Sequence, residues 1–125
     1  MTSEEFDAVV DESLESIPGK FRDRMKNLSV IVQNWPTDAQ LKSVGMRPGQ
    51  GLLFGLYSGV PRTKGGHYAV KLPDQIILFR LPLMMVSKTE SDLKRNIRST
   101  VLHEVGHHFG MSESEIRDAL NSHGD

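Results

Sequence analysis

The sequence predicts a single α+β or α/β domain. Helical and strand patterns alternate through the first two thirds of the chain, and helical patterns alone follow. The length of 125 residues suits one domain with a real hydrophobic core, and 38% hydrophobic and 25% charged residues are typical of a globular protein. We therefore expect residues 1–125 to form one domain.

The first predicted helix begins near Ser3, which is an N-cap residue followed by acidic residues. Apolar residues then recur every three or four positions up to Ile17, and Pro18 ends the pattern. Runs of apolar and β-branched residues predict strands at 28–33, 52–57, 67–70 and 75–80. One or two helical turns are expected at 37–44, a loop at 58–66 and an irregular segment at 83–88.

A long helix is predicted from Thr89 to Gly110, with Thr89 as its N-cap and acidic residues in its first turn. Gly110 suits the left-handed conformation that ends many helices. Ser112 and Glu115 then match a capping box, which predicts a last helix over residues 116–120.

Composition excludes several kinds of site. The chain has no cysteine, so it has no disulfide, thiol nucleophile or cysteine-bound zinc, and a metal ion must be held by histidine and carboxylate. Its net charge is −1, from 15 basic and 16 acidic residues, which indicates neither a nucleic-acid nor a membrane partner. No signal peptide or membrane-spanning run is recognisable. We expect a cytoplasmic protein, and a monomer.

One motif contains residue types that can bind a metal ion and catalyse hydrolysis. Residues 103–113 read His-Glu-Val-Gly-His-His-Phe-Gly-Met-Ser-Glu. On a helix, His103 and His107 lie on one face, at the spacing that lets two imidazoles bind one zinc ion. Glu104 is rotated by about 100° from His103. It is therefore poorly placed as a ligand but can reach a zinc-bound water, whose pKa the metal lowers to about 7. Glu104 is the predicted general base.

A third ligand is needed to complete the site. If Gly110 ends the helix, the chain turns back toward the metal, and Glu113 is the first acidic residue after that turn. We predict Glu113 as the third ligand, which leaves a fourth position for water, as in catalytic zinc sites. His108 is about 100° round the helix from His107 and is expected at the surface or behind the ligands. Arg98, with Lys94 and Arg95, is interpreted as a solvated helix face.

The extended motif resembles the zinc-binding consensus of metzincin-like peptidases, in which the last position is usually His or Asp. The chain is more similar still to the minimal zincins, small bacterial proteins assigned as metallopeptidases. That likeness extends over roughly residues 50 to 120, through the segments at 56–61 and 72–80 and the motif helix. Glu113 departs from the consensus because glutamate is longer than aspartate.

The resemblance implies a zincin-like α+β fold, in which a small mixed sheet packs against the active-site helix, with flanking helices. It implies Zn²⁺ held by His103, His107 and Glu113, with Glu104 as the base, and a peptide or protein substrate. In such folds an edge strand can hold the peptide by strand addition. Residues 75–80 are our predicted edge strand.

The predicted function is therefore zinc-dependent peptide-bond hydrolysis, and two alternatives stay open. One is a regulatory or interaction module with a closed zinc site, which requires a fourth ligand from His108 or His67 and has no use for Glu104. The other is a zinc endoribonuclease like those of bacterial ribosomal-RNA maturation, which place three histidines at the same spacing. The net charge and Glu104 speak against the latter. Manganese, iron or cobalt also suit two imidazoles and a carboxylate.

Overall fold

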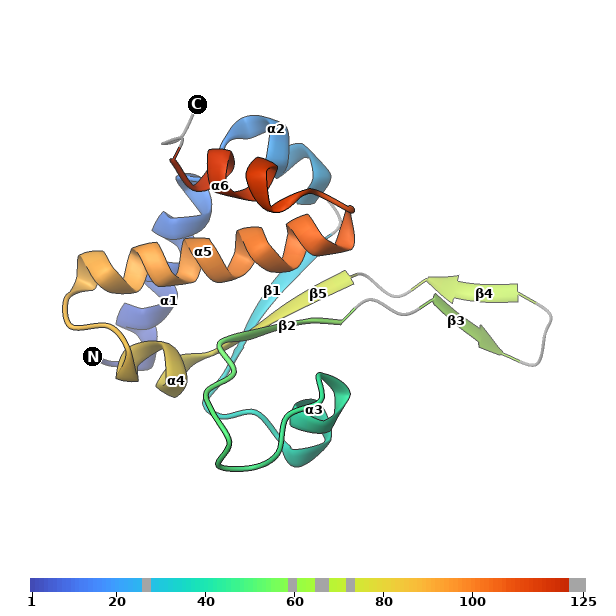
Figure 1. Ribbon diagram of the computed structural model, residues 1–125, viewed down its shortest axis with the longest axis horizontal. Coiled ribbons are helices and arrows are strands. Elements are labelled where there is room, and N and C mark those ends of the chain that lie inside the picture. The colour runs from blue at the N-terminus through green and yellow to red at the C-terminus, as the bar shows by residue number, and fades with distance from the viewer. Residues whose placement is uncertain (26–27, 59–60, 65–67, 72–73, 122–125) are drawn as a thin grey trace.

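Figure 1 shows a computed structural model of the chain, which describes residues 1–25, 28–58, 61–64, 68–71 and 74–121. The fold is α+β: a small mixed sheet lies beside helices α1 and α5, and α6 lies on the other side of α5. The helices are α1 (Ser3–Glu15), α2 (Gly19–Arg22), a 3-10 turn (Asp23–Met25), α3 (Asp38–Ser43), α4 (Arg80–Met85), α5 (Glu90–His108) and α6 (Glu113–Asn121). The strands are β1 (Leu28–Gln33), β2 (Gly55–Ser58), β3 (Pro61–Lys64), β4 (Tyr68–Lys71) and β5 (Asp74–Phe79).

The three-stranded sheet has the order β1-β5-β2, so β5 is its central strand. β5 pairs with β1 in parallel, with Val30 opposite Ile76, and with β2 in antiparallel fashion, with Tyr57 opposite Ile76. The prediction that residues 75–80 form an edge was therefore wrong. The edge strand beside α5 is β2. An apolar run such as that of β5 is typical of a strand covered on both faces and paired on both sides.

The core lies between the sheet and the two helices α1 and α5. It is formed by alternate residues of β1 and β5 and by the apolar stripes of the helices. Its buried members include Ile76, Leu78, Phe6, Val9, Ile97, Val101 and Val105, and the partly buried Val30 and Val32 pack against them. Because α5 supplies one side of this core, its position along the sheet is fixed by packing.

The helix ends follow the sequence closely. Thr2, rather than the predicted Ser3, is the N-cap of α1, since its hydroxyl accepts from the Glu5 backbone N–H at 3.1 Å while Glu5 reaches back to the Thr2 N–H at 2.9 Å. Thr89 caps α5 as predicted. Among the described residues, no helix is long and apolar enough to cross a membrane.

Two elements differ from the sequence prediction. Residues 61–64 form β3, which pairs with β4, although they were predicted as part of a loop. Figure 1 shows this hairpin projecting from the end of the sheet, away from the helices. Helix α4 covers residue 80 and residues 83–85, which were predicted as the end of a strand and as part of an irregular segment. Pro82 lies in the first turn of this helix, where the missing N–H of proline costs little.

A glycine allows β2 to lie directly against α5. A Cβ placed on Gly55 is 2.5 Å from the Thr100 Cγ2 methyl and 3.4 Å from the Ile77 carbonyl oxygen. The first distance is far shorter than carbon atoms of two separate side chains can approach. The close approach of strand and helix therefore requires glycine at this position.

We expect Gly55→Ala to lower the free energy of unfolding by roughly 1–3 kcal/mol, the usual effect of overpacking. Urea unfolding followed by circular dichroism measures it. Adding Thr100→Ser removes the methyl group while keeping the hydroxyl, and should restore most of the loss. Gly51→Ala is the control, because its added Cβ makes only an ordinary contact, 3.5 Å from the Met46 methyl. Equal losses in Gly55→Ala and Gly51→Ala would refute the steric explanation.

Candidate metal centre

The turn after α5 brings the end of the motif back over the helix. Gly110 has a positive φ of 69°, and the Met111 N–H donates to the Gly106 carbonyl at 2.8 Å. The Gly110 N–H donates to the His107 carbonyl at 3.2 Å, which completes a Schellman turn. The prediction that Gly110 ends the helix is confirmed. α6 then begins with the predicted capping box of Ser112 and Glu115.

His103 and His107 lie on the same face of α5, as their spacing predicts. Their ring centroids are 5.9 Å apart and the rings meet edge to face at 72°. The side chain of His103 is 38% exposed and that of His107 is 58% exposed. Both imidazoles therefore lie side by side at an open surface of the molecule.

The carboxylate of Glu113 lies against both imidazoles. Its Oε1 is 3.1 Å from His107 Nε2, and its Oε2 is 4.0 Å from His103 Nε2. The hydrogen bond with His107 is the main cause that lowers the pKa of Glu113, and the nearby histidines lower it further. Glu113 thus stays ionised, as a metal-binding carboxylate must.

The tautomer of His103 is set on the other side of its ring. Nδ1 lies 2.8 Å from the Ser99 carbonyl oxygen, which can only accept a hydrogen bond. The Ser99 hydroxyl is more distant, at 3.4 Å. Nδ1 therefore carries the proton, and the lone pair of Nε2 faces Glu113. Ligating histidines are commonly oriented by such a bond to a carbonyl.

Two imidazoles and a carboxylate are suitable ligands for a zinc ion, although the distances between them are not those of a site with zinc bound. No group of three histidine, aspartate or glutamate side chains within the described residues is already arranged as the ligands of one ion. Tetrahedral ligands with bonds of about 2.0–2.1 Å lie roughly 3.3 Å apart. The contact of Glu113 with His107 is close to this separation, and that with His103 is longer. Because the Glu113 side chain is 67% exposed, it can rotate to shorten the longer distance.

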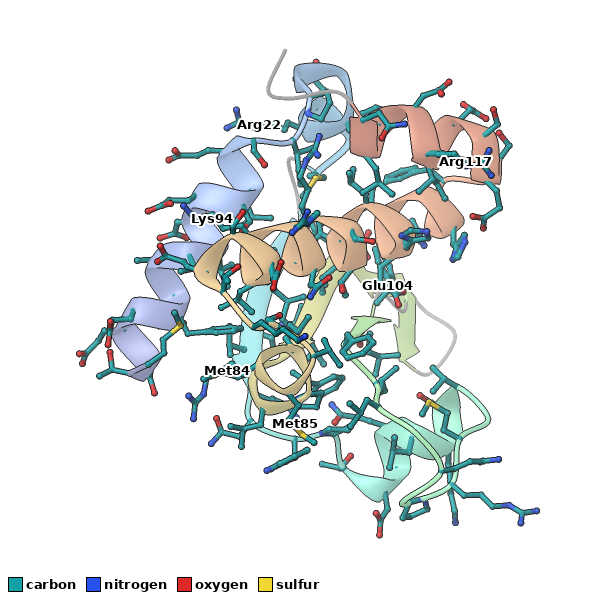
Figure 2. The ribbon with its side chains drawn as sticks, turned by 60° about the vertical axis from the view of Figure 1, so that its left-hand side comes forward. Arg22, Met84, Met85, Lys94, Glu104 and Arg117 are labelled. Atoms are coloured by element: carbon teal, nitrogen blue, oxygen red, sulfur yellow. The ribbon has the colours of Figure 1, made fainter. Side chains whose placement is uncertain are left out.

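Glu104 is close enough to His103 and His107 for both to affect the pKa of its carboxyl group. It is half-buried, and its carboxylate accepts a hydrogen bond from the backbone N–H of Tyr57 in β2. Figure 2 shows Glu104 on the side of α5 opposite α6. Burial raises the pKa of Glu104, while the Tyr57 N–H and the two histidines oppose that rise. This is an environment in which a carboxylate gains basicity without losing its orientation.

Tyr57 connects the edge strand to the end of α5, a role that the sequence analysis missed. Its ring stacks on the imidazole of His108, with centroids 4.0 Å apart and planes 18° apart. Its hydroxyl donates to Asp74 Oδ2 at 2.6 Å. Burial and this bond raise the pKa of Tyr57, so the phenol stays protonated. The only signal in the sequence was an aromatic residue at the end of the strand predicted at 52–57, far from the motif in the chain.

Arg98 is the clearest error among the side-chain predictions. It was interpreted as part of a solvated face with Lys94 and Arg95, but its side chain is buried, with 6% exposed. Lys94 instead pairs with Glu12 of α1, and Arg95 with Asp92. Arg98 lies three and seven residues before the core positions 101 and 105, so on a helix it faces the same side as they do. The sequence pattern therefore already pointed its side chain toward the core. His67 lies outside the described residues.

A cleft of about 260 Å³ opens beside the candidate centre. On one side it is bounded by the α5 residues Ser99, Thr100, His103 and Glu104, and on the other by the chain that leads into β2, Leu52, Leu53, Phe54 and Gly55. The cleft therefore joins the predicted base and one predicted ligand to a mainly apolar wall.

A family model described as zincin-like metallopeptidase matches residues 25–121. The chain belongs to this family. The matched segment of this zincin-like protein includes the whole sheet, α5 and α6, and thus every residue of the candidate centre. Membership suggests zinc binding and metal-dependent hydrolysis at the level of the family. No curated protein matches the chain.

Proposed function

We propose that this zincin-like protein is a zinc-dependent peptidase in which His103, His107 and Glu113 hold the metal ion and Glu104 is the general base. The observation that carries the proposal is the position of one ionised carboxylate, Glu113, against the Nε2 atoms of both helix histidines. Membership of the zincin-like family supports it. Zinc at this position supplies Lewis acidity, which polarises a carbonyl group and lowers the pKa of a water molecule.

Glu104 has the properties that the proton transfers require. Its raised pKa makes it a better base than an exposed glutamate, and the Tyr57 N–H fixes the direction of its carboxylate. The carboxylate accepts the proton of the attacking water and later gives it to the leaving amine. Since Glu104 lines the cleft with His103, the proton is transferred where a peptide can lie.

The edge position of β2 in the sheet supports a peptide as the substrate. The Phe79 N–H donates to the Phe54 carbonyl at 2.9 Å, so Phe54 points its backbone groups toward β5. In an antiparallel pair the alternate residues, Gly55 and Tyr57, point theirs away from β5. The Tyr57 N–H is bound to Glu104, whereas Gly55 borders the cleft. An extended peptide can add to this edge, with an apolar side chain against Leu53 and Phe54.

The test is to load the purified protein with zinc, measure the metal by elemental analysis, and incubate it with a mixed peptide library and with RNA. We expect about one zinc per chain, and peptide cleavage beside apolar residues that a chelator abolishes. His107→Ala is the control that should lose both metal and activity. One bound zinc without cleavage of peptides would instead support a binding module, and RNA cleavage would support the nuclease alternative. A wild-type protein that binds no zinc would overturn the proposal.

A further inference from the structure

α6 carries Glu113 as its first residue, and it is fastened to α5 at both of its ends. At the near end, Gly106 lies under Ile116: a Cβ on Gly106 is 2.7 Å from the Ile116 side chain. At the far end, Arg98 of α5 reaches the last turn of α6. α6 therefore runs back along α5, as Figure 1 also shows.

The far attachment is a pair of strong hydrogen bonds. Arg98 Nη1 donates to the Leu120 carbonyl at 2.6 Å, and Nη2 donates to the Ala119 carbonyl at 2.8 Å. The last carbonyls of a helix have no partner within the helix. A buried guanidinium satisfies two of them and places its positive charge at the negative end of the helix dipole. An apolar side chain of similar size cannot replace this contact.

The direction of Glu113 depends on how α6 is oriented. A helix held only at its first turn is free to roll about its own axis or to lift from its neighbour. Either movement swings the first side chain of the helix. The near contact is apolar and non-directional, because it is made by the buried side chain of Ile116. The two hydrogen bonds of Arg98 are directional, so they fix the roll of α6.

We propose that Arg98 is a positioning residue for the metal centre: through α6 it holds the carboxylate of Glu113 against the Nε2 atoms of His103 and His107. This inference rests on the proposed function, because it treats Glu113 as a ligand. Arg98 touches neither metal nor substrate in this account. It acts at the other end of the helix that presents the ligand.

A double-mutant cycle on zinc affinity tests the proposal. The zinc dissociation constant is measured by competition with a chromophoric chelator for the wild type, Arg98→Met, Glu113→Ala and the double variant. We expect Arg98→Met to weaken zinc binding by about 10–100-fold, the range found for groups that orient ligands. In the Glu113→Ala background the same change should have almost no effect, because the ligand that Arg98 positions is already gone.

Other outcomes contradict either the role of Arg98 or the assignment of Glu113 as a ligand. Equal weakening by Arg98→Met in both backgrounds means that Arg98 acts through general stability and not through Glu113. No weakening in either background also overturns the role of Arg98. If Glu113→Ala alone binds zinc as tightly as the wild type, the ligand assignment fails, and with it the proposed metal centre. A loss in Glu113→Ala without any effect of Arg98→Met refutes only the further inference.

Two further variants separate an effect on zinc binding from a loss of folding. Arg95→Met is the matched control, because Arg95 lies on the same helix with a 70% exposed side chain, paired with Asp92. It should bind zinc as the wild type does. If Arg98→Met fails to fold by circular dichroism, Arg98→Lys replaces it in the cycle. Lysine can donate to one of the two carbonyls, so we expect an intermediate affinity and faster hydrogen exchange of the α6 amides. Wild-type affinity in a folded Arg98→Lys protein with freely exchanging α6 amides would overturn the proposal.

Discussion

Glu104→Gln should bind zinc like the wild type and hydrolyse peptides about 10²–10⁴-fold more slowly, the usual contribution of a general base. Glutamine keeps the shape of the side chain, and its amide oxygen can still accept from the Tyr57 N–H. It has no carboxylate with which to accept a proton. The change therefore removes the proton transfer and leaves the predicted ligands untouched.

The measurement combines zinc content with kcat/KM on a peptide that the wild type cleaves. The unfolding temperature shows whether the variant keeps the wild-type structure. It should change little because Glu104 is only half-buried. Loss of zinc in Glu104→Gln would show that Glu104 is itself a ligand. Unchanged kcat/KM at full zinc content would show that another group takes the proton.

Glu113→Ala should reduce zinc affinity by at least about 100-fold, since it removes a charged ligand and leaves two imidazoles. Activity should be lost at zinc concentrations that saturate the wild type. The apo protein should keep its stability, because the Glu113 side chain is exposed and contributes little to packing. Titration with zinc under chelator competition measures the effect.

Glu115→Ala is the matched control for Glu113→Ala, because both residues are acidic and lie in the first turn of α6. Glu115 reaches the Ser112 N–H and completes the capping box, so its loss should weaken the helix start by about 1 kcal/mol. It should reduce zinc affinity far less than Glu113→Ala does. If both variants lose affinity equally, Glu113 acts as a helix-start residue and not as a ligand.

The sequence predicted the parts of the fold that local chemistry determines. The strand over residues 28–33 matches β1, and the strong start and stop signals at Thr89 and Gly110 bracket α5. A capping box and a positive-φ glycine are satisfied by neighbouring backbone atoms, so they can be recognised without knowing the rest of the fold. The spacing of His103, His107 and Glu113 is local in the same sense.

The errors concern features that depend on tertiary pairing. Nothing in residues 75–80 distinguishes a central strand from an edge strand, because the partner on each side comes from elsewhere in the chain. β3 was missed because Pro61 and the neighbouring glycines resemble a loop. The burial of Arg98 was missed because a charged residue is usually exposed, although its helical phase pointed to the core.

The group that orients Glu104 also could not be predicted from the local sequence. The groups predicted to hold the metal come from one continuous segment, whereas the group that orients Glu104 is a backbone amide of β2, far earlier in the chain. A backbone N–H has no signature in the sequence. Tyr57 could be connected with Glu104 only once the antiparallel pairing of β2 with β5 was known.

The proposed ligands lie on α5 and α6, whereas the group that orients Glu104 lies on β2. This arrangement has a consequence for folding. All three proposed ligands lie in one short stretch, so the unfolded chain can already bind zinc weakly through the same side chains. Any such affinity reduces the extent to which zinc stabilises the folded state, since only differential binding counts. By contrast, orientation of Glu104 requires β1, β5 and β2 to assemble, a set of long-range pairings that form slowly. Under the proposed function, newly made chains would therefore carry metal before they could catalyse, and hydrolysis would be delayed until the sheet is complete.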